Sequence, residues 1–363
     1  MVSGGLYRGS LGELRKLFNT LRVRGYRVIG PKLEDGVIRL RELTSFDQIP
    51  YGWGDVQAPG TYRVVRGGSF RVGPDSPKRF LYPPKLELFR IRPDWSVEYP
   101  RERFAPTAFF AIRPCDLASI AVMDRVQGTS GDPHYLGLRG ELALIVENCV
   151  EPGDTCFCAT MGTGPEARDG FDVAFTRLGD DLVVFRPGSD LGVELLSCLN
   201  LEPADDSTLR TYYEALREAE ARARAPFDLS RLPDELELGL DSPVFKEVAE
   251  RCFGCAGCNM ICPTCFCFDV IDEPLLEGGA VRYRVWDGCI AYSYAEVAGG
   301  NFRRDLWARY RHWVLHKFAY WVRQFGVFGC VGCGRCVTWC PAGVDLRDVI
   351  RRVVEWVRSR GGG

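Results

Sequence analysis

Apolar residues recur at helical spacing near both ends of the chain. Near the N-terminus, Ser10 followed three residues later by Glu13 has the pattern of a capping box, and the positions after it present one apolar face. This pattern predicts a helix over residues 11–24. A last amphipathic helix is predicted close to the C-terminus, with an apolar face made by Leu346, Val349, Ile350, Val353 and Val357.

Two short apolar runs in the first half of the chain predict buried central strands. Residues 108–112 and 142–147 are almost wholly apolar, as strands are when both faces of a sheet are covered. The first run leads to Cys115 and the second to Cys149. Because binding residues gather at strand ends in open α/β sheets, we expect chemistry there. Further strands are predicted at residues 26–29, 37–43, 61–66, 171–176 and 182–185.

Helical patterns dominate the second half of the chain. A charged amphipathic helix is predicted over residues 207–224, and an acidic, proline-containing stretch follows it. Beyond that stretch, apolar residues at helical spacing predict a long helix from Phe302 to Phe325, capped by Asn301 and ended by Gly326.

Composition narrows the class of protein. The 363 residues include 46 Lys and Arg and 48 Asp and Glu, so the formal charge of −2 predicts neither a nucleic-acid nor a membrane partner. Neither a signal peptide nor an apolar run long enough to span a membrane is recognisable, and we expect a cytoplasmic protein. Scarce Asn and Gln with abundant arginine fit a thermophile, or a GC-rich genome. Sixteen cysteines in a reducing compartment indicate metal or cluster ligation rather than disulfides.

The strongest chemical signal is a duplicated cysteine motif. The pattern C-x-x-C-x-x-C-x-x-x-C-P occurs at residues 252–263 and again at 330–341. In this motif three thiolates surround one 4Fe-4S cluster, and the fourth cysteine ligates the neighbouring cluster. Structural zinc competes with this interpretation, but zinc sites are usually built from two separated cysteine pairs. The predicted ligands are a first cysteine set, Cys252, Cys255, Cys258 and Cys340, and a second cysteine set, Cys330, Cys333, Cys336 and Cys262.

The long segment between Cys262 and Cys330 bears on the fold. A compact bacterial ferredoxin has a much shorter linker between its motifs, so this spacing is typical of a helical two-cluster module. The sequence therefore predicts an α+β fold in three parts. These are a mixed α/β domain at residues 1–225, a linker at 226–242 and a helical ferredoxin domain with two 4Fe-4S clusters at 243–363.

Four cysteines of the first half form a candidate third site for a metal or iron–sulfur cluster. Cys115 and Cys149 follow the two buried strands, and Cys156 and Cys158 lie in the loop after the second. These four are called the third cysteine set below. Free cysteines are often simply small buried hydrophobes, and this alternative stays open.

Other cysteines are alternative ligands of the third site. The tetrapeptide Thr-Cys-Phe-Cys occurs both at 155–158 and at 264–267, so a mixed site could also draw on Cys265, Cys267 and Cys289. Cys198, in an apolar stretch, is assigned to the core.

His312 and His316 lie four residues apart, on one face of the predicted long helix. With Lys317 beside them, they are interpreted as cationic groups near the clusters or as a solvated helix face, in preference to a metal site. No flavin or nicotinamide motif is recognisable, because the glycines near residue 162 lack the rest of either fingerprint.

Several longer strings carry a family resemblance. They are RPCD at 113–116, CVEPGDTCFC at 149–158, CFGCAGCNMICPTCFCFDV at 252–270, VAGGNFR at 297–303, HKFAY at 316–320 and CVGCGRC at 330–336. Together they resemble the beta subunit of cytoplasmic sulfhydrogenases, which are heteromeric NiFe hydrogenases that also reduce sulfur. They equally resemble the A subunit of anaerobic sulfite reductase.

The resemblance implies an electron-transfer subunit. Its expected partners are a flavin-containing, NAD(P)-binding subunit and either the small and large hydrogenase subunits or the subunits of a sulfite reductase. The chain alone would then relay electrons and perform no bond chemistry. A different hypothesis gives the third site an incompletely ligated cluster that reduces sulfur within this subunit, and a further one is a structural zinc protein.

Overall fold

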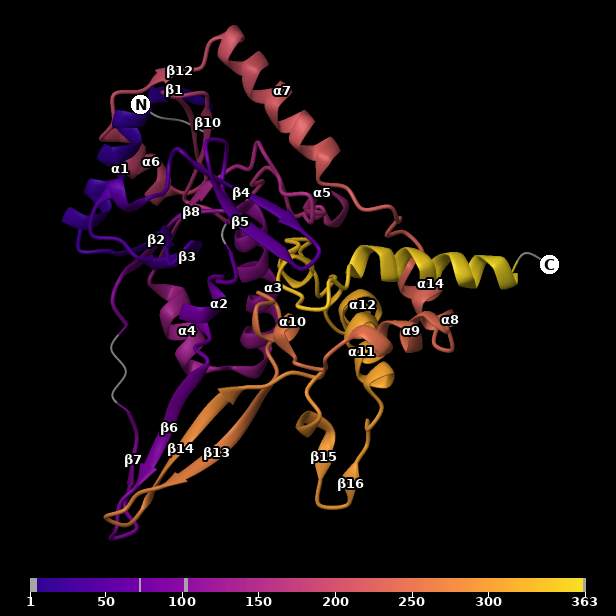
Figure 1. Cartoon of the computed structure of the whole chain (residues 1–363). Helices are drawn as coiled ribbons and strands as arrows, with labels where there is room; N and C mark the ends of the chain where they lie inside the picture. Colours follow the sequence, from indigo (N-terminus) through magenta and orange to yellow (C-terminus); the bar gives the residue numbers. More distant parts are fainter. Residues whose placement is uncertain (1–4, 72, 101–103, 362–363) are drawn as a thin grey trace.

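The computed structural model of the chain describes residues 5–71, 73–100 and 104–361. A sheet covered by helices occupies the first half, and a bundle of helices and cysteine-rich loops lies beside it, as Figure 1 shows. An arm of long strands projects from the body on one side, and the last helix extends away from it on another. The predicted α+β class, with a mixed α/β part before a helical part, is confirmed.

Eight strands form the central sheet, in the order β12-β1-β11-β10-β9-β8-β2-β3. The four strands β2, β8, β9 and β10 run parallel, and antiparallel strands complete both edges. The two apolar runs are neighbours in this sheet, as expected. The bounds are β1 (Tyr7–Ser10), β2 (Arg27–Glu34), β3 (Val37–Glu42), β8 (Thr107–Ile112), β9 (Leu142–Glu147), β10 (Val173–Leu178), β11 (Leu182–Pro187) and β12 (Glu202–Pro203).

Helices cover both faces of this sheet because successive side chains of a strand point to opposite sides. In β8, Ala108 and Phe110 pack toward α1, whereas Phe109 and Ile112 pack toward α3. The N-cap predicted for α1 is present, since the Ser10 hydroxyl accepts from the Glu13 backbone N–H. The helices of this half are α1 (Leu11–Val23), η1 (Phe46–Gln48), α2 (Lys78–Leu81), α3 (Pro114–Ser130), α4 (Pro133–Gly140), α5 (Cys158–Met161), α6 (Asp190–Ser197) and α7 (Asp206–Arg222).

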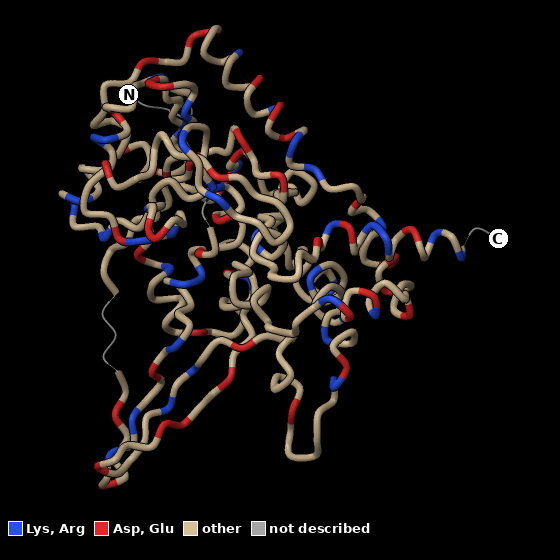
Figure 2. Tube along the Cα trace, in the orientation of Figure 1, with Lys and Arg blue, Asp and Glu red and all other residues tan. Residues whose placement is uncertain are grey.

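The projecting arm joins the two halves of the chain in one sheet. Strand β14 of the second half pairs antiparallel with β6 of the first half, and β13 and β7 add to the two edges. Figure 2 shows both signs of charge interspersed along this arm and along α7. The small hairpins β4–β5 and β15–β16 lie outside both larger sheets. The strands are β4 (Trp53–Ala58), β5 (Thr61–Arg66), β6 (Lys85–Ile91), β7 (Val97–Glu98), β13 (Phe268–Pro274), β14 (Ala280–Trp286), β15 (Glu296–Val297) and β16 (Gly300–Asn301).

The helical part has its own apolar core, and the predicted linker takes part in it. Helix α8, within residues 226–242, packs on η3 and α14 and buries Leu232 and Leu236 there. Where one domain ends and the next begins therefore stays a prediction. The elements are α8 (Leu232–Leu238), α9 (Val244–Arg251), α10 (Gly257–Met260), η2 (Ser293–Ala295), α11 (Leu306–Leu315), η3 (His316–Tyr320), α12 (Trp321–Phe325), α13 (Arg335–Thr338) and α14 (Leu346–Gly361).

The predicted long helix begins later than expected and is interrupted. Asn301 lies in β16, where its side-chain amide donates to the Tyr292 carbonyl, and Asp305 stands at the N-cap of α11. The assignment of Asn301 as the cap was therefore wrong, because its side chain bonds the Tyr292 carbonyl and the Arg303 N–H instead, ahead of the helix. The segment η3 is a π-helix, a local widening that recurs at functional sites. Gly326 ends the helix in the left-handed conformation, as predicted.

A buried ion pair fastens the two parts together beside the cysteine-rich loops. Arg335 of α13 lies 2.8 Å from the Asp116 carboxylate at the start of α3, and both side chains are buried. The Arg335 guanidinium also donates to the Gly73 carbonyl. Because removal of one partner would leave a buried charge uncompensated, this pair constrains how the helical part lies on the sheet.

Candidate metal centres

The two copies of the cysteine motif fold in the same way. Gly254 and Gly332, each two residues after the first cysteine of its motif, have φ of 65° and 63°. Ala256 and Gly334, two residues further on, are also in the left-handed region, with φ of 55° and 74°. A short helix then follows in each copy, α10 in the first and α13 in the second. The duplication seen in the sequence is thus a duplication of backbone geometry.

The first cysteine set surrounds one cavity. Cys340 joins Cys252, Cys255 and Cys258 in lining it, although it belongs to the other motif. The wall is otherwise largely apolar and includes Tyr310. Backbone N–H groups point at the sulfurs, because Gly254 N lies 3.5 Å from the Cys252 Sγ and Val344 N lies 3.4 Å from the Cys340 Sγ. N–H donors to sulfur are typical of iron–sulfur sites.

The second cysteine set also combines the two motifs. Burial raises the pKa of Cys330 to about 12, and Cys333 and Cys262 are among the neighbouring groups that influence it. A hydrogen bond from the Cys265 thiol and the nearby Lys317 ammonium hold the pKa of Cys262 well below its usual range. The Gly332 backbone N–H lies 3.4 Å from the Cys330 Sγ. Cys340 and Cys262 thus each lie near the cysteines of the other motif. That they ligate clusters there stays a prediction.

The third cysteine set lines a second cavity. All four of its cysteines contribute, and so does Cys333 of the second set. Burial raises the pKa of each of the four thiols, and that of Cys156 to about 12. Four thiols around one space, three of them on buried cysteines, fit a ligand that replaces their protons, since metals bind thiolates.

Three arginines complete the wall of the second cavity, of which Arg113 and Arg335 are buried. Arg71, Arg113 and Arg335 each have a buried guanidinium nitrogen without a hydrogen-bond partner. Each guanidinium also lies near a carboxylate, 3.3 Å from Asp55, 3.5 Å from Glu147 and 2.8 Å from Asp116, respectively. A buried donor without a partner is costly. An anionic iron–sulfur cluster ligated by the four cysteines would accept hydrogen bonds from these N–H groups, so the residues fit such a group.

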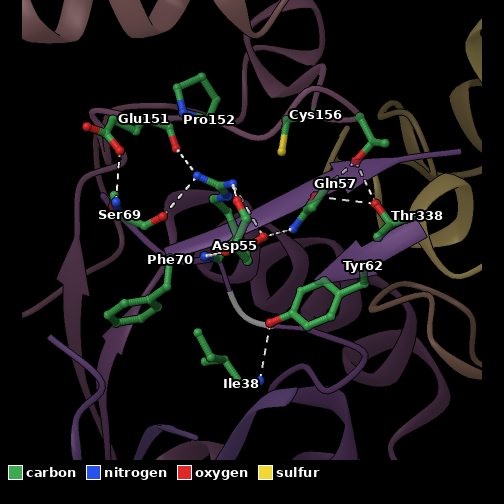
Figure 3. A network of polar contacts seen from close by, with 12 residues as sticks. Ile38, Asp55, Gln57, Tyr62, Ser69, Phe70, Glu151, Pro152, Cys156 and Thr338 are labelled. Carbon is green, nitrogen blue, oxygen red and sulfur yellow. Dashed lines mark hydrogen bonds and ion pairs between the residues drawn. The ribbon is translucent and has the colours of Figure 1, made fainter. Parts of the chain in front are cut away.

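A polar network connects the wall of this cavity to the β4–β5 hairpin (Figure 3). The Gln57 side chain donates to Asp55 at 2.7 Å and accepts from Thr155 at 3.0 Å and from Thr338 at 3.3 Å. The hydroxyls of Thr155 and Thr338 lie 2.7 Å apart. The hairpin thereby holds the loop with Cys156 against the second motif.

The loop of the third set and the loop of the second set touch through their backbones. The Phe157 N–H donates to the Gly332 carbonyl at 2.8 Å. A Cβ at Gly332 would lie 2.6 Å from the Phe157 carbonyl, and one at Gly334 would lie 2.6 Å from the Thr155 carbonyl. Both positions require glycine, since side-chain atoms there would collide with backbone.

The remaining cysteines lie away from the second cavity. Asn259 is fully buried, and its side-chain amide lies 3.7 Å from the Cys265 Sγ and 3.4 Å from the Cys289 Sγ. Cys267 and Cys289 both lie near Tyr294. These three cysteines are therefore grouped with one another rather than with the third set. Cys198 is exposed, so its assignment to the core was wrong: the apolar residues beside it pack inward from α6 and leave it at the helix end.

The two histidines of the long helix stack on each other, with ring centroids 5.6 Å apart. Burial lowers the pKa of His312 to about 4 and that of His316 to about 3. Both rings are therefore neutral at pH 7, and the expectation of two cationic histidines is wrong because their surroundings disfavour the charged form. Within η3, the cationic side chain is Lys317.

The polar residues that hold the cysteines in place were not predicted from the sequence. Gln57, Arg71 and Lys78 come from the first hundred residues, in which no motif was found. Of these three, only Lys78 had a signal in the sequence, namely the scarcity of lysine, since the chain has six in all.

The close approach of the two loops predicts different effects for two matched substitutions. Gly332→Ala and Gly254→Ala both place a side chain in the left-handed region, but the added Cβ meets the Phe157 backbone only in the first. At Gly254 the nearest atom is the Leu306 side chain at 3.4 Å. We expect Gly332→Ala to lower the free energy of unfolding by about 1–3 kcal/mol more than Gly254→Ala, measured by guanidinium denaturation. Equal destabilisation would contradict the contact.

Comparisons with known proteins bear on the part of the chain that contains the first and second cysteine sets. Residues 251–344 match the family model described as 4Fe-4S dicluster domain. The chain is 32% identical over 346 residues to a curated protein named sulfhydrogenase 2 subunit beta, from Pyrococcus furiosus, covering 94% of this chain and 96% of that protein. No solved structure matches the chain significantly. No helix in the described ranges is long and apolar enough to cross a membrane. The chain is an iron–sulfur protein of the electron-transfer type, and it belongs to the family of sulfhydrogenase beta subunits.

Proposed function

We propose that the chain is the electron relay of a heteromeric NiFe hydrogenase and sulfur reductase, with three 4Fe-4S clusters in a row. The observation that carries this proposal is the position of the second cysteine set between the other two. Cys336 lines the first cavity together with the first set, and Cys333 lines the second cavity together with the third set. Bound clusters would supply one-electron storage with little rearrangement.

The residues of this chain would hold each cluster by thiolates and tune it by hydrogen bonds. In this proposal the first and second sets are the ligands of two clusters, with Cys340 and Cys262 exchanged between motifs. The third set is proposed as the complete ligand shell of another. Because four cysteines line its cavity, this ligand shell has no open position, which favours a relay over a sulfur-reducing centre.

Structural zinc is a weaker candidate for these sites. A tetrahedral zinc ion draws its four ligands to about 2.0–2.3 Å from one point. Among the described residues, no group of three or more His, Cys, Asp or Glu side chains is close enough to hold a single metal ion. Cysteines that surround a cavity without meeting at one point suit the larger cubane instead.

The partners are proposed from the relative's name and from the first cavity. A protein named as a subunit belongs to an assembly. We propose a flavin-containing, NAD(P)-binding subunit and the small and large hydrogenase subunits as partners of this chain, in the cytoplasm. Cys255 is exposed, and the neighbouring Phe253 is 70% exposed. A partner that packs on this edge would come close to the first set.

Iron content tests the number of clusters. We expect the double variant Cys156→Ala/Cys158→Ala to contain about four iron atoms fewer per chain than the wild type, because one 4Fe-4S cluster would lose half of its ligands. The exposed Cys198 supplies the control, and Cys198→Ala should leave iron unchanged. Iron and acid-labile sulfide are measured on the intact complex. Unchanged iron in the double variant would exclude a third cluster ligated by this set.

Activity of the same double variant separates a relay from a sulfur-reducing site. If the third set belongs to the relay, the intact complex should lose both sulfur reduction and hydrogen-dependent reduction of NAD(P)⁺. If it holds a separate sulfur-reducing centre, only sulfur reduction should be lost. Retention of both activities would contradict both roles.

Co-purifying chains distinguish the hydrogenase from an anaerobic sulfite reductase. The identity to a sulfhydrogenase subunit favours the hydrogenase. We expect mass spectrometry of the purified complex to find a large subunit with paired C-x-x-C motifs near both ends. A sirohaem-binding subunit in its place would contradict the hydrogenase assignment.

A further inference from the structure

Two lysines are buried beside the second cysteine set without a carboxylate partner. Lys78 and Lys317 are 4% and 3% exposed, although lysine is almost never fully buried unless it is paired. Within residues 5–71, 73–100 and 104–361, neither ammonium group lies in an ion pair with a carboxylate; each is held by uncharged acceptors instead. A buried ammonium group is costly without negative charge nearby, and burial accordingly lowers the pKa of Lys78.

Both lysines reach the same stretch of chain from different parts of the fold. Lys78 of α2 donates to the Met260 carbonyl at 3.1 Å, and its ammonium lies 3.9 Å from the centre of the Trp286 ring. Lys317 of the π-helical segment η3 donates to the Thr264 hydroxyl at 3.0 Å and to the Gly329 carbonyl at 2.9 Å. Their acceptors thus flank Cys262, which lies between Met260 and Thr264.

The charge that these lysines face comes from the second set. Cys262 is near both ammonium groups, and Cys330 is near Lys317. The Gly329 carbonyl that holds Lys317 immediately precedes Cys330. Cys265, the next cysteine along, is near both lysines as well.

The arginines of the second cavity differ from these lysines. Arg71, Arg113 and Arg335 each lie within ion-pair distance of a carboxylate, so much of their charge is offset within the protein. Among the described residues, neither Lys78 nor Lys317 lies within ion-pair distance of a carboxylate. A cluster at the second set would therefore feel an unusually large positive potential from Lys78 and Lys317.

We propose that Lys78 and Lys317 are positioning residues that raise the reduction potential of the cluster held by the second cysteine set. Reduction adds a negative charge to an anionic group, and nearby fixed positive charges stabilise the reduced form. The lysines thereby favour residence of the electron at the middle of the row. This inference rests on the proposed function, because it requires a cluster at the second set.

A redox titration followed by EPR spectroscopy tests the role of the lysines. The titration uses the full chain with its partner subunits, and the signal of the second set is assigned as the one lost in Cys330→Ala. We expect Lys78→Gln and Lys317→Gln each to lower the reduction equilibrium constant of that signal at least tenfold, which is about 59 mV for a one-electron couple. Glutamine keeps a donor for the carbonyls but removes the charge.

Two kinds of control make the titration decisive. Lys85→Gln removes a lysine of the arm that is 47% exposed and paired with Glu273, and it should leave the potential unchanged. Lys78→Arg and Lys317→Arg keep the charge and should keep the potential near that of the wild type. If a glutamine variant loses the cluster while the matching arginine variant keeps it, the charge is again required.

Three results would overturn the inference. One is an unchanged potential in both glutamine variants, and another is an equal shift in the glutamine and arginine variants. The third is loss of the cluster in both types of variant, which would assign the lysines a packing role. Failure of the proposed function looks different, because the wild-type complex would then have no Cys330-dependent signal at all.

Discussion

The arrangement of the sites depends on one close backbone contact, between residues 155–158 and the loop 330–336. The Phe157 N–H bonds the Gly332 carbonyl, and two glycines leave no side chain between the loops. Because of this contact, Cys333 lines the cavity of the third set as well as belonging to the second. The duplicated motif alone would place only the first and second cysteine sets beside each other. The contact between the two loops brings the third set next to the second.

Buried charged residues set the electrostatic environment of any group bound by the second and third cysteine sets. Arg335 joins Asp116 across the junction of the two parts, and its guanidinium lies beside both the second and the third sets. Around the third set the arginines are paired with carboxylates but keep N–H groups free for an acceptor. Around the second set, neither Lys78 nor Lys317 pairs with a carboxylate of the residues that the structure describes. The protein thus supplies two different electrostatic environments to two adjacent cysteine sets, and such environments tune cluster potentials.

The sequence allowed the elements with strong periodicity to be predicted, along with the cysteines that lie at motif spacing. Helix α1, strands β8 and β9 and the helix ending at Gly326 depend on local patterns, which are visible in one sequence. Cys115 and Cys149 could be brought together in advance because parallel neighbours end at the same edge. The motif also indicated that Cys340 and Cys262 would each lie near the cysteines of the other copy.

Long-range contacts could not be predicted in the same way. The pairing of β14 with β6 joins segments that have no shared pattern, and Gln57 reaches Thr155 and Thr338 only because the β4–β5 hairpin folds over them. The burial of Lys78 depends on where α2 lies relative to the first motif. Exposure of Cys198 likewise depends on which side of α6 faces the sheet.

The central claim is that three 4Fe-4S clusters lie in one row with the second set in the middle. EPR spectroscopy of the fully reduced complex tests it most directly, in the wild type and in Cys330→Ala. The account predicts three centres in this chain whose signals are broadened by magnetic coupling between neighbours, and sharper signals from the outer two when the middle one is lost. Only two centres in the wild type, or outer signals that stay equally broad without the middle one, would contradict it.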